Sequence, residues 1–284
     1  MFKRKLGWSS VRVPAIGQGT WQIEGDRNME LQAIETLRLG LDLGMAHIDT
    51  AEMYGNGHTE ELVAEAIAGR RDEVFLVSKV LPSNASYEGT LRACERSLKR
   101  LNTDWLDLYL LHWPSRYPIV ETMRAMEKLV AEGLIRFIGV SNFDTEQLKA
   151  AEHALENERI ACDQVLYHLR ERGIERRLIP YCIKREIPVV GYAPFGHGNF
   201  PSPKSAGGLV LAEIAKRHSR TPRQVALNFL VMRYPSMFII PKSIHPDRVK
   251  ENSGGVGWEL TAEDCAAIEE AFPVPAEDVP LRMI

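Results

Sequence analysis

The chain has 284 residues, of which 45% are hydrophobic and 26% are charged, and its formal net charge is -3 at pH 7. This length and composition are typical of a globular protein with one well-buried core, and the small net charge argues against nucleic acid or an anionic membrane as a partner. No apolar stretch approaches the roughly 20 residues that cross a bilayer. The N-terminal Met-Phe-Lys-Arg-Lys-Leu-Gly lacks the apolar run of a signal peptide, so we expect a cytoplasmic protein.

The first expected elements are a β-hairpin and then a repeating pattern. Residues 1–14 carry two short alternating segments around Gly7-Trp8-Ser9-Ser10, which predict the hairpin. Short apolar runs then alternate with longer amphipathic stretches. The expected strands are 15–19, 47–51, 74–80, 106–112, 135–140, 162–167, 188–193 and 237–241. The expected helices include 30–44, 58–70, 88–101, 119–132 and 144–156.

Strands that alternate with helices in this way predict a parallel sheet closed into a barrel. The runs are apolar throughout, as expected for strands that are covered on both faces. An open doubly wound sheet shows the same alternation but requires a G-x-G-x-x-G turn. The turn at 17–21 is Gly-Gln-Gly-Thr-Trp, without the third glycine. We therefore predict an α/β fold, a single (β/α)8 TIM barrel over residues 1–284, with an N-terminal hairpin and extra C-terminal helices.

The second half of the chain contains a charged segment, a long loop and two further helix starts. Residues 170–177 mix charges of both signs and are interpreted as a solvated helix start. Residues 194–207 form a loop rich in Gly, Pro and Ser, long enough for a functional lid. Thr221 with Pro222 marks a helix N-terminus, and a last helix is expected from Thr261 to about Phe272.

The four cysteines are widely spaced and form no C-x-x-C pair. They are Cys94, Cys162, Cys182 and Cys265. This spacing indicates neither a zinc site nor a redox motif, so we expect no metal. Free, mostly buried thiols suit a reducing compartment.

Four polar residues follow or end successive strand-like runs: Asp49, Tyr54, Lys79 and His112. In a parallel α/β barrel these positions converge on the face that holds the active site. A tyrosine has a pKa of about 10 and is a poor acid at neutral pH. A nearby lysine favours the phenolate, and a carboxylate keeps that lysine charged. His112 can orient a carbonyl oxygen by a hydrogen bond. The set predicts a carbonyl-reduction site, with Tyr54 as general acid, Lys79 as its activator and Asp49 as the partner of Lys79.

A second group lies between residues 240 and 252, where a strand end leads into a helix N-terminus. Such a terminus binds anions. Lys242, Ser243 and Arg248 are candidates to hold a phosphate monoester, and Glu251 and Asn252 to reach adenine or ribose. The alternative is a polar helix cap with solvated charges.

A third group ends the fifth to seventh strands. Ser141, Asn142 and Gln164 offer short amide and hydroxyl groups that suit a carboxamide such as that of nicotinamide. Tyr192 can stack on a flat ring. Apolar side chains beside the catalytic candidates are expected to line the substrate pocket: Trp21, Met53 and Trp113.

From residue 10 to about 272 the chain resembles the aldo-keto reductases. The matching segments are Gly17-x-Gly19-Thr20-Trp21, Asp49-Thr50-Ala51-x-x-Tyr54-Gly55, Lys79, Leu110-Leu111-His112-Trp113-Pro114, Gly139-Val140-Ser141-Asn142-Phe143 and Ile240-Pro241-Lys242-Ser243 with Arg248, Glu251 and Asn252. Within the family it looks most similar to small bacterial methylglyoxal or diketo-gluconate reductases. The resemblance implies the same catalytic tetrad and NADPH as cofactor, bound extended and without a Rossmann domain.

The resemblance also implies a set of contact residues. Cofactor contacts are implied for Gly19, Thr20, Trp21, Asp49, Ser141, Asn142, Gln164, Tyr192, Ala193, Phe195, Lys242, Ser243, Arg248, Glu251 and Asn252. Substrate contacts are implied for Trp21, Tyr54, His112 and Trp113. Residues 193–198 depart from the family pattern, in which many members place serine at the first position and leucine at the third, so the pyrophosphate contacts stay open. The tail after Phe272 is short, and we expect a more open substrate pocket.

These observations predict NADPH-dependent reduction of aldehydes or ketones to alcohols. The expected partner is a small carbonyl substrate, and the expected state is a monomer or weak oligomer. One alternative is an accessory or sensor protein that binds the cofactor in the same barrel but turns over slowly, like the potassium-channel β subunits. A second is a phosphate-handling isomerase or aldolase, with Lys79 as a Schiff-base nucleophile.

Overall fold

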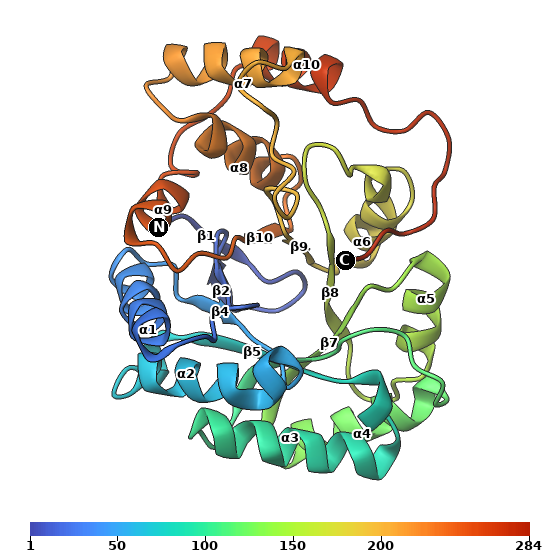
Figure 1. Ribbon diagram of the computed structural model, residues 1–284. Coiled ribbons are helices and arrows are strands. Elements are labelled where there is room, and N and C mark those ends of the chain that lie inside the picture. The colour runs from blue at the N-terminus through green and yellow to red at the C-terminus, as the bar shows by residue number, and fades with distance from the viewer.

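Eight parallel strands at the centre of the molecule are surrounded by helices, as the computed structural model of residues 1–284 shows (Figure 1). The strands are β3 (Gln18–Gly19), β4 (His47–Asp49), β5 (Phe75–Val80), β6 (Leu106–Leu111), β7 (Ile135–Ser141), β8 (Ile160–Leu166), β9 (Val189–Tyr192) and β10 (Met237–Ile240). They pair in sequence order from β3 to β10. Parallel bridges from Ile16 to Ile239 and from Gly19 to Lys242 join the two end strands. The predicted barrel is confirmed.

Ten helices connect and flank these strands. They are α1 (Arg27–Asp42), α2 (His58–Ile67), α3 (Tyr87–Leu101), α4 (Ile119–Ala131), α5 (Thr145–His153), α6 (Leu178–Arg185), α7 (Ala206–Arg217), α8 (Pro222–Met232), α9 (Pro246–Ser253) and α10 (Ala262–Ala271). Four short 3-10 helices are η1 (Tyr54–Gly57), η2 (Arg71–Glu73), η3 (Pro82–Asn84) and η4 (Gly173–Glu175). Thr221 and Thr261 cap α8 and α10 with capping boxes, so these predicted starts are confirmed. No helix is long and apolar enough to cross a membrane.

The predicted N-terminal hairpin is also confirmed, and it closes one end of the barrel. Strands β1 (Lys3–Lys5) and β2 (Arg12–Pro14) pair antiparallel. Leu6 and Val13 of this hairpin belong to the buried cluster that fills the barrel interior. The Trp8 indole donates a hydrogen bond to the Ile160 carbonyl oxygen, 3.0 Å away. The functional side chains are therefore confined to the opposite end, as in other parallel barrels.

The interior and the helix-facing side of the sheet form two apolar layers. The interior contains Val77, Leu108 and Leu110, whereas a larger cluster lies between strands and helices. Every residue of β5, β6 and β8 is buried, which explains why these runs are mostly apolar and show no regular alternation. Their few polar residues are Ser78, Lys79, Asp107, Asp163 and Gln164. All four cysteines are free thiols, and three of them are buried.

The interpretation of residues 170–177 as solvated is wrong for the middle of the segment. Arg172 and Glu175 are almost fully buried and pair with each other. The Arg172 guanidinium also donates to the Phe272 carbonyl oxygen, so this segment links the β8 side of the barrel to the end of α10. Charge pattern alone does not show that a partner from the far end of the chain covers these groups.

The C-terminal tail turns back toward the barrel. Figure 1 shows it running from α10 to an end beside α6 and β8. The Asp278 carboxylate forms an ion pair with Arg176, and Arg282 Nε lies 3.4 Å from Glu171 Oε2. The last residue, Ile284, lines the main cavity. The short tail therefore contributes its last residue to the cavity wall, while an opening wider than in relatives with longer tails stays a prediction.

Candidate active site

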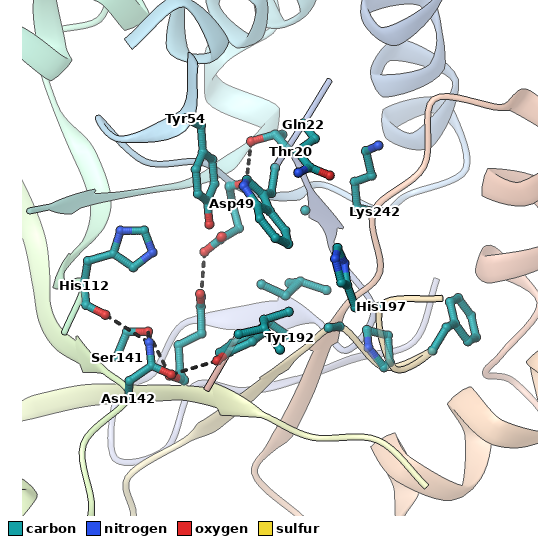
Figure 2. Close-up of a pocket in the computed structure, with 18 of the residues that line it drawn as sticks. Thr20, Gln22, Asp49, Tyr54, His112, Ser141, Asn142, Tyr192, His197 and Lys242 are labelled. Atoms are coloured by element: carbon teal, nitrogen blue, oxygen red, sulfur yellow. Dashed lines mark hydrogen bonds between the residues drawn. The ribbon is translucent and has the colours of Figure 1, made fainter. Parts of the chain in front are cut away.

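A cavity of about 330 Å³ lies at the carboxyl ends of the barrel strands. Its walls carry most of the residues that the sequence pointed to. Those are Gly19, Thr20, Trp21, Asp49, Met53, Tyr54, His112, Trp113, Ser141, Asn142, Gln164, Tyr192, Ala193, Phe195 and Lys242. Figure 2 shows Tyr54 and His112 on one side of this cavity and His197 and Lys242 on the other.

Lys79 lies beneath the cavity, paired with Asp49. Asp49 ends β4, and Lys79 lies on the neighbouring strand β5. The Lys79 Nζ donates to Asp49 Oδ1 at 2.5 Å and to the Thr50 carbonyl oxygen at 2.8 Å. Burial disfavours the charged lysine, but Asp49 and Tyr54 more than offset this, so the pKa of Lys79 is raised. The ammonium stays charged in a dry site.

Tyr54 begins η1, directly above this ion pair. Its ring centroid lies 5.1 Å from Lys79 Nζ. The pKa of Tyr54 is raised above its ordinary value, because burial disfavours the phenolate more than the Lys79 cation favours it. The Lys79 cation acts in the expected direction, and the burial of the phenol outweighs it. The phenol therefore holds its proton at neutral pH, which is the form that a general acid requires.

His112 follows β6 and is held between two aromatic rings. Its ring stacks on the Trp113 ring with centroids 3.8 Å apart, and it meets the Tyr54 ring edge-on with centroids 5.7 Å apart. Burial and the Lys79 cation place the pKa of His112 well below its ordinary value. The imidazole is therefore neutral, and its buried Nδ1 has no partner. A proton on Nε2 avoids an unpaired buried N–H and provides a donor for a carbonyl oxygen.

The three residues assigned to a carboxamide form a hydrogen-bonded group with Tyr192, Asp49 and His112. The Gln164 amide donates to Asp49 Oδ2 at 2.7 Å, and Ser141 Oγ donates to the Gln164 carbonyl oxygen at 2.9 Å. The Asn142 amide donates to the His112 carbonyl oxygen at 3.1 Å. Tyr192 donates to Asn142 Oδ1 at 2.8 Å. These contacts appear as dashed lines in Figure 2.

Asn142 adopts a left-handed backbone conformation, with φ of 61°. Asparagine tolerates this region better than most residues. The turn lets Ser141 and Asn142 face the same cavity although they are adjacent in the sequence. Local strain of this kind is typical of positions that a site requires.

The segment between β9 and α7 covers part of the cavity. Residues 193–205 contain no helix or strand, and Pro194, Phe195 and His197 line the cavity. The His197 ring stacks on Trp21 with centroids 5.0 Å apart. The predicted lid segment therefore contacts the opposite wall.

Four predicted cofactor residues do not line this cavity: Ser243, Arg248, Glu251 and Asn252. They lie just after Lys242 or on α9. Arg248 is more than half exposed and pairs with Glu251 at 2.7 Å. Asn252 is buried, with its Oδ1 unpartnered. These residues before and on α9 thus lie outside the cavity, and their assignment to the cofactor stays a prediction.

Sequence reasoning missed several cavity residues, namely Gln22, Arg223 and Ile284. Arg223 lies in the first turn of α8, where the sequence pattern predicts an exposed charged residue. Ile284 arrives from the end of the chain. Neither position carries a local signal, because each depends on contacts far away in the sequence.

The buried lysine disfavours the Schiff-base alternative. A nucleophilic lysine requires a neutral amine that is open to substrate. Lys79 has no exposed surface, donates to Asp49 and does not line the cavity.

Comparison with known proteins identifies the family. The profile described as "Aldo/keto reductase family" matches residues 15–272. The chain belongs to the aldo/keto reductase family. It is therefore an oxidoreductase, and the resemblance seen in its motifs is confirmed.

Individual relatives of this aldo/keto reductase cover nearly its whole length. Methylglyoxal reductase YeaE of Escherichia coli (strain K12) is 41% identical over 96% of each chain. Glyoxal reductase of Bacillus subtilis (strain 168) is 34% identical over 92% of this chain and 90% of its own. A crystal structure of an aldo-keto reductase from Klebsiella pneumoniae in complex with NADPH matches with a TM-score of 0.93, at 41% identity and full coverage of both chains. A second Klebsiella structure, with NADP and acetate, gives a TM-score of 0.89 at 42% identity and 96% coverage of each chain.

Proposed function

We propose that this protein reduces small aldehydes or ketones to alcohols, with a hydride from NADPH and a proton from Tyr54. The observation that carries the proposal is the wall where Tyr54 and His112 face one cavity above the Asp49–Lys79 pair. The residues fit the cofactor: amide and hydroxyl groups lie at the catalytic end, and the cation Lys242 lies at the other. Bound NADPH would supply the hydride.

The chain's own residues have separate roles in this proposal. His112, neutral at pH 7, donates a hydrogen bond to the substrate oxygen and orients it. Tyr54 protonates that oxygen. Lys79 stabilises the phenolate that remains, and Asp49 balances the lysine charge. Trp21, Met53 and Trp113 line the cavity, and we assign them to the substrate pocket.

The substrate class that we propose is small and reactive. Two relatives are named as reductases of methylglyoxal and of glyoxal. The cavity is shared between cofactor and substrate, and Ile284 covers part of it, which favours small carbonyl compounds over bulky ones.

The decisive test compares the native protein with Tyr54→Phe. We expect NADPH oxidation with methylglyoxal or glyoxal, and a loss of about a hundredfold or more in the variant, with NADPH binding retained. Tyr117→Phe is the matched control, because Tyr117 lies outside the cavity. Activity in Tyr54→Phe would remove Tyr54 as the acid. Tight NADPH binding without turnover by the native protein would favour the accessory-protein alternative.

Cofactor preference is tested at Arg248. We expect Arg248→Ala to weaken NADPH binding by about tenfold or more, since charge-assisted hydrogen bonds to a phosphate are lost. NADH, which has no 2′-phosphate, is expected to bind both proteins alike. Fluorescence titration of the two dinucleotides measures this. Equal losses for NADPH and NADH would contradict the assignment of Arg248 to the 2′-phosphate.

A further inference from the structure

Two cations on the cavity wall form no ion pair with a carboxylate of the chain. Glu24 acts on Lys242 only through space, and it accepts a hydrogen bond from Thr59 Oγ1. Lys242 and Arg223 both line the cavity, and neither makes an ion pair or a side-chain hydrogen bond among those found in the structure. Arg223 is half-buried. Leaving a partly buried cation unpaired is unfavourable, so the arrangement points to an anion that comes from outside the chain.

Arg223 is held in position by two aromatic rings. Its guanidinium carbon lies 4.6 Å from the ring centroid of Phe195 and 4.8 Å from that of Phe200. The two rings meet edge-on, 5.7 Å apart. Cation–π contacts orient a guanidinium without neutralising it. Its N–H donors therefore remain available on the cavity side.

The nearest charged groups do not supply the missing partner. Arg248 and Glu251 both act on Arg223 through space, but Glu251 already pairs with Arg248 and accepts a hydrogen bond from Thr221 Oγ1 at 2.6 Å. Arg248 adds a second positive charge on the same side. The region therefore has an excess of cations next to the cavity.

We propose that Arg223, held by Phe195 and Phe200 on the wall that also carries Lys242, binds the pyrophosphate of the dinucleotide. The inference rests on the proposed function and adds a binding residue to it. Arg223 lines the same cavity as Asp49, Tyr54 and His112, whereas Arg248 does not. Because the 2′-phosphate is assigned to Arg248 outside the cavity, the pyrophosphate is the anion of the proposed cofactor that remains for a cation on the cavity wall.

The test is the binding of NADPH and NADH to Arg223→Met. Methionine keeps the apolar contact with Phe195 and Phe200 but removes the charge. We expect both dissociation constants to rise by a similar factor of about ten or more, because both cofactors carry a pyrophosphate. Arg223→Lys, which keeps the charge, is expected to recover part of the affinity. Arg220→Met is the matched control, since Arg220 lies over Trp258 and outside the cavity.

Salt dependence separates a phosphate contact from a purely structural role. Added salt screens charge pairs, so NADPH binding to Arg223→Met is expected to weaken less with salt than binding to the native protein. An unchanged salt dependence would mean that Arg223 only positions the 193–205 segment.

Each of the remaining outcomes would overturn the role of Arg223, its pyrophosphate assignment or the proposed function. Native affinity for both dinucleotides in Arg223→Met would remove Arg223 from the site while leaving the proposed function intact. A loss for NADPH alone would show a 2′-phosphate contact and overturn the pyrophosphate assignment. If the native protein binds neither dinucleotide, both the proposed function and this inference fail.

Discussion

Tyr54 is protonated and His112 is neutral at pH 7, as the proposed carbonyl reduction requires, and burial is the main cause of both states. Burial raises the pKa of Tyr54 and lowers that of His112. The charge of Lys79 opposes the first effect and adds to the second. The sequence predicted the participants, but the balance between burial and charge depends on how deeply each group lies in the barrel.

A pH profile tests these states. The proposed reduction uses protonated Tyr54 and neutral His112, so kcat/KM for the carbonyl substrate is expected to stay flat between about pH 7 and pH 8, the region between the ordinary pKa values of the two groups. It falls only at alkaline pH, once Tyr54 loses its proton. Steady-state kinetics at saturating NADPH measure this profile, which reports groups of the enzyme before the substrate binds. A steep change in kcat/KM between pH 7 and 8 that is caused by titration of Tyr54 or His112 would contradict the assigned protonation states.

At the scale of elements, apolar runs and caps predicted most strands and helices. The strand expected at 15–19 is shorter in the structure, because regular pairing covers only Gln18–Gly19 and Ile16 meets the last strand through an isolated bridge.

Close packing explains why position 17 is a glycine. A Cβ there would lie 2.7 Å from the His47 carbonyl oxygen and 2.9 Å from its ring. Close approaches of this kind involve residues distant in sequence and are not visible in a local pattern.

The η4 segment gives an element-scale prediction on stability. Glu175 is 3% exposed at its side chain and accepts hydrogen bonds from Arg172, Tyr167 and Tyr234. Arg172→Met leaves this carboxylate buried without its main cation, so we expect a loss of about 3–5 kcal/mol in the free energy of unfolding. Urea denaturation measures it.

Arg177→Met is the matched control from the same charged segment. Arg177 is 60% exposed and makes only long ion pairs, so its replacement is expected to change stability by less than about 0.5 kcal/mol. Similar losses in the two variants would contradict a special role for the buried pair. The contrast also shows why the mixed-charge segment could not be interpreted from composition, because one buried arginine lies among three exposed ones.

At the scale of the whole molecule, one barrel brings together groups that lie far apart in the chain. Register between parallel strands brings Lys79 and Gln164 to the two carboxylate oxygens of Asp49. The sequence predicted the Asp49–Lys79 pair, but not the hydrogen bond from Gln164. The positions of Arg223 and Ile284 were not predictable in the same way. They depend on how the C-terminal helices and the tail pack over the barrel, which no short pattern encodes.

The same barrel buries His47, which lies two residues before Asp49 on β4. Burial lowers the pKa of His47 from 6.5 to about 4, and nearby Asp49 and Lys79 act in opposite directions on it. Both ring nitrogens lack partners, and the ring packs edge-on against Phe75 and Phe238. The folded protein therefore holds this imidazole neutral inside the barrel.

This state makes stability depend on pH. Between pH 6.5 and about 4, the unfolded chain binds a proton at His47 that the folded protein does not, so stability falls as the pH falls through this window. The full contribution is about 3 kcal/mol, at 1.36 kcal/mol per pKa unit, and no further loss from His47 occurs below about pH 4. His112 acts in the same direction, because its pKa is also lowered.

His47→Leu is expected to flatten this dependence. The leucine cannot take up a proton in either state, so the variant should lose less stability than the native protein between pH 6.5 and 4.5, whatever its stability at pH 7. Urea denaturation at several pH values measures the two slopes. His153→Leu provides the control, because His153 is exposed. Parallel slopes for native protein and His47→Leu would mean that the folded barrel admits a charged imidazole at this depth.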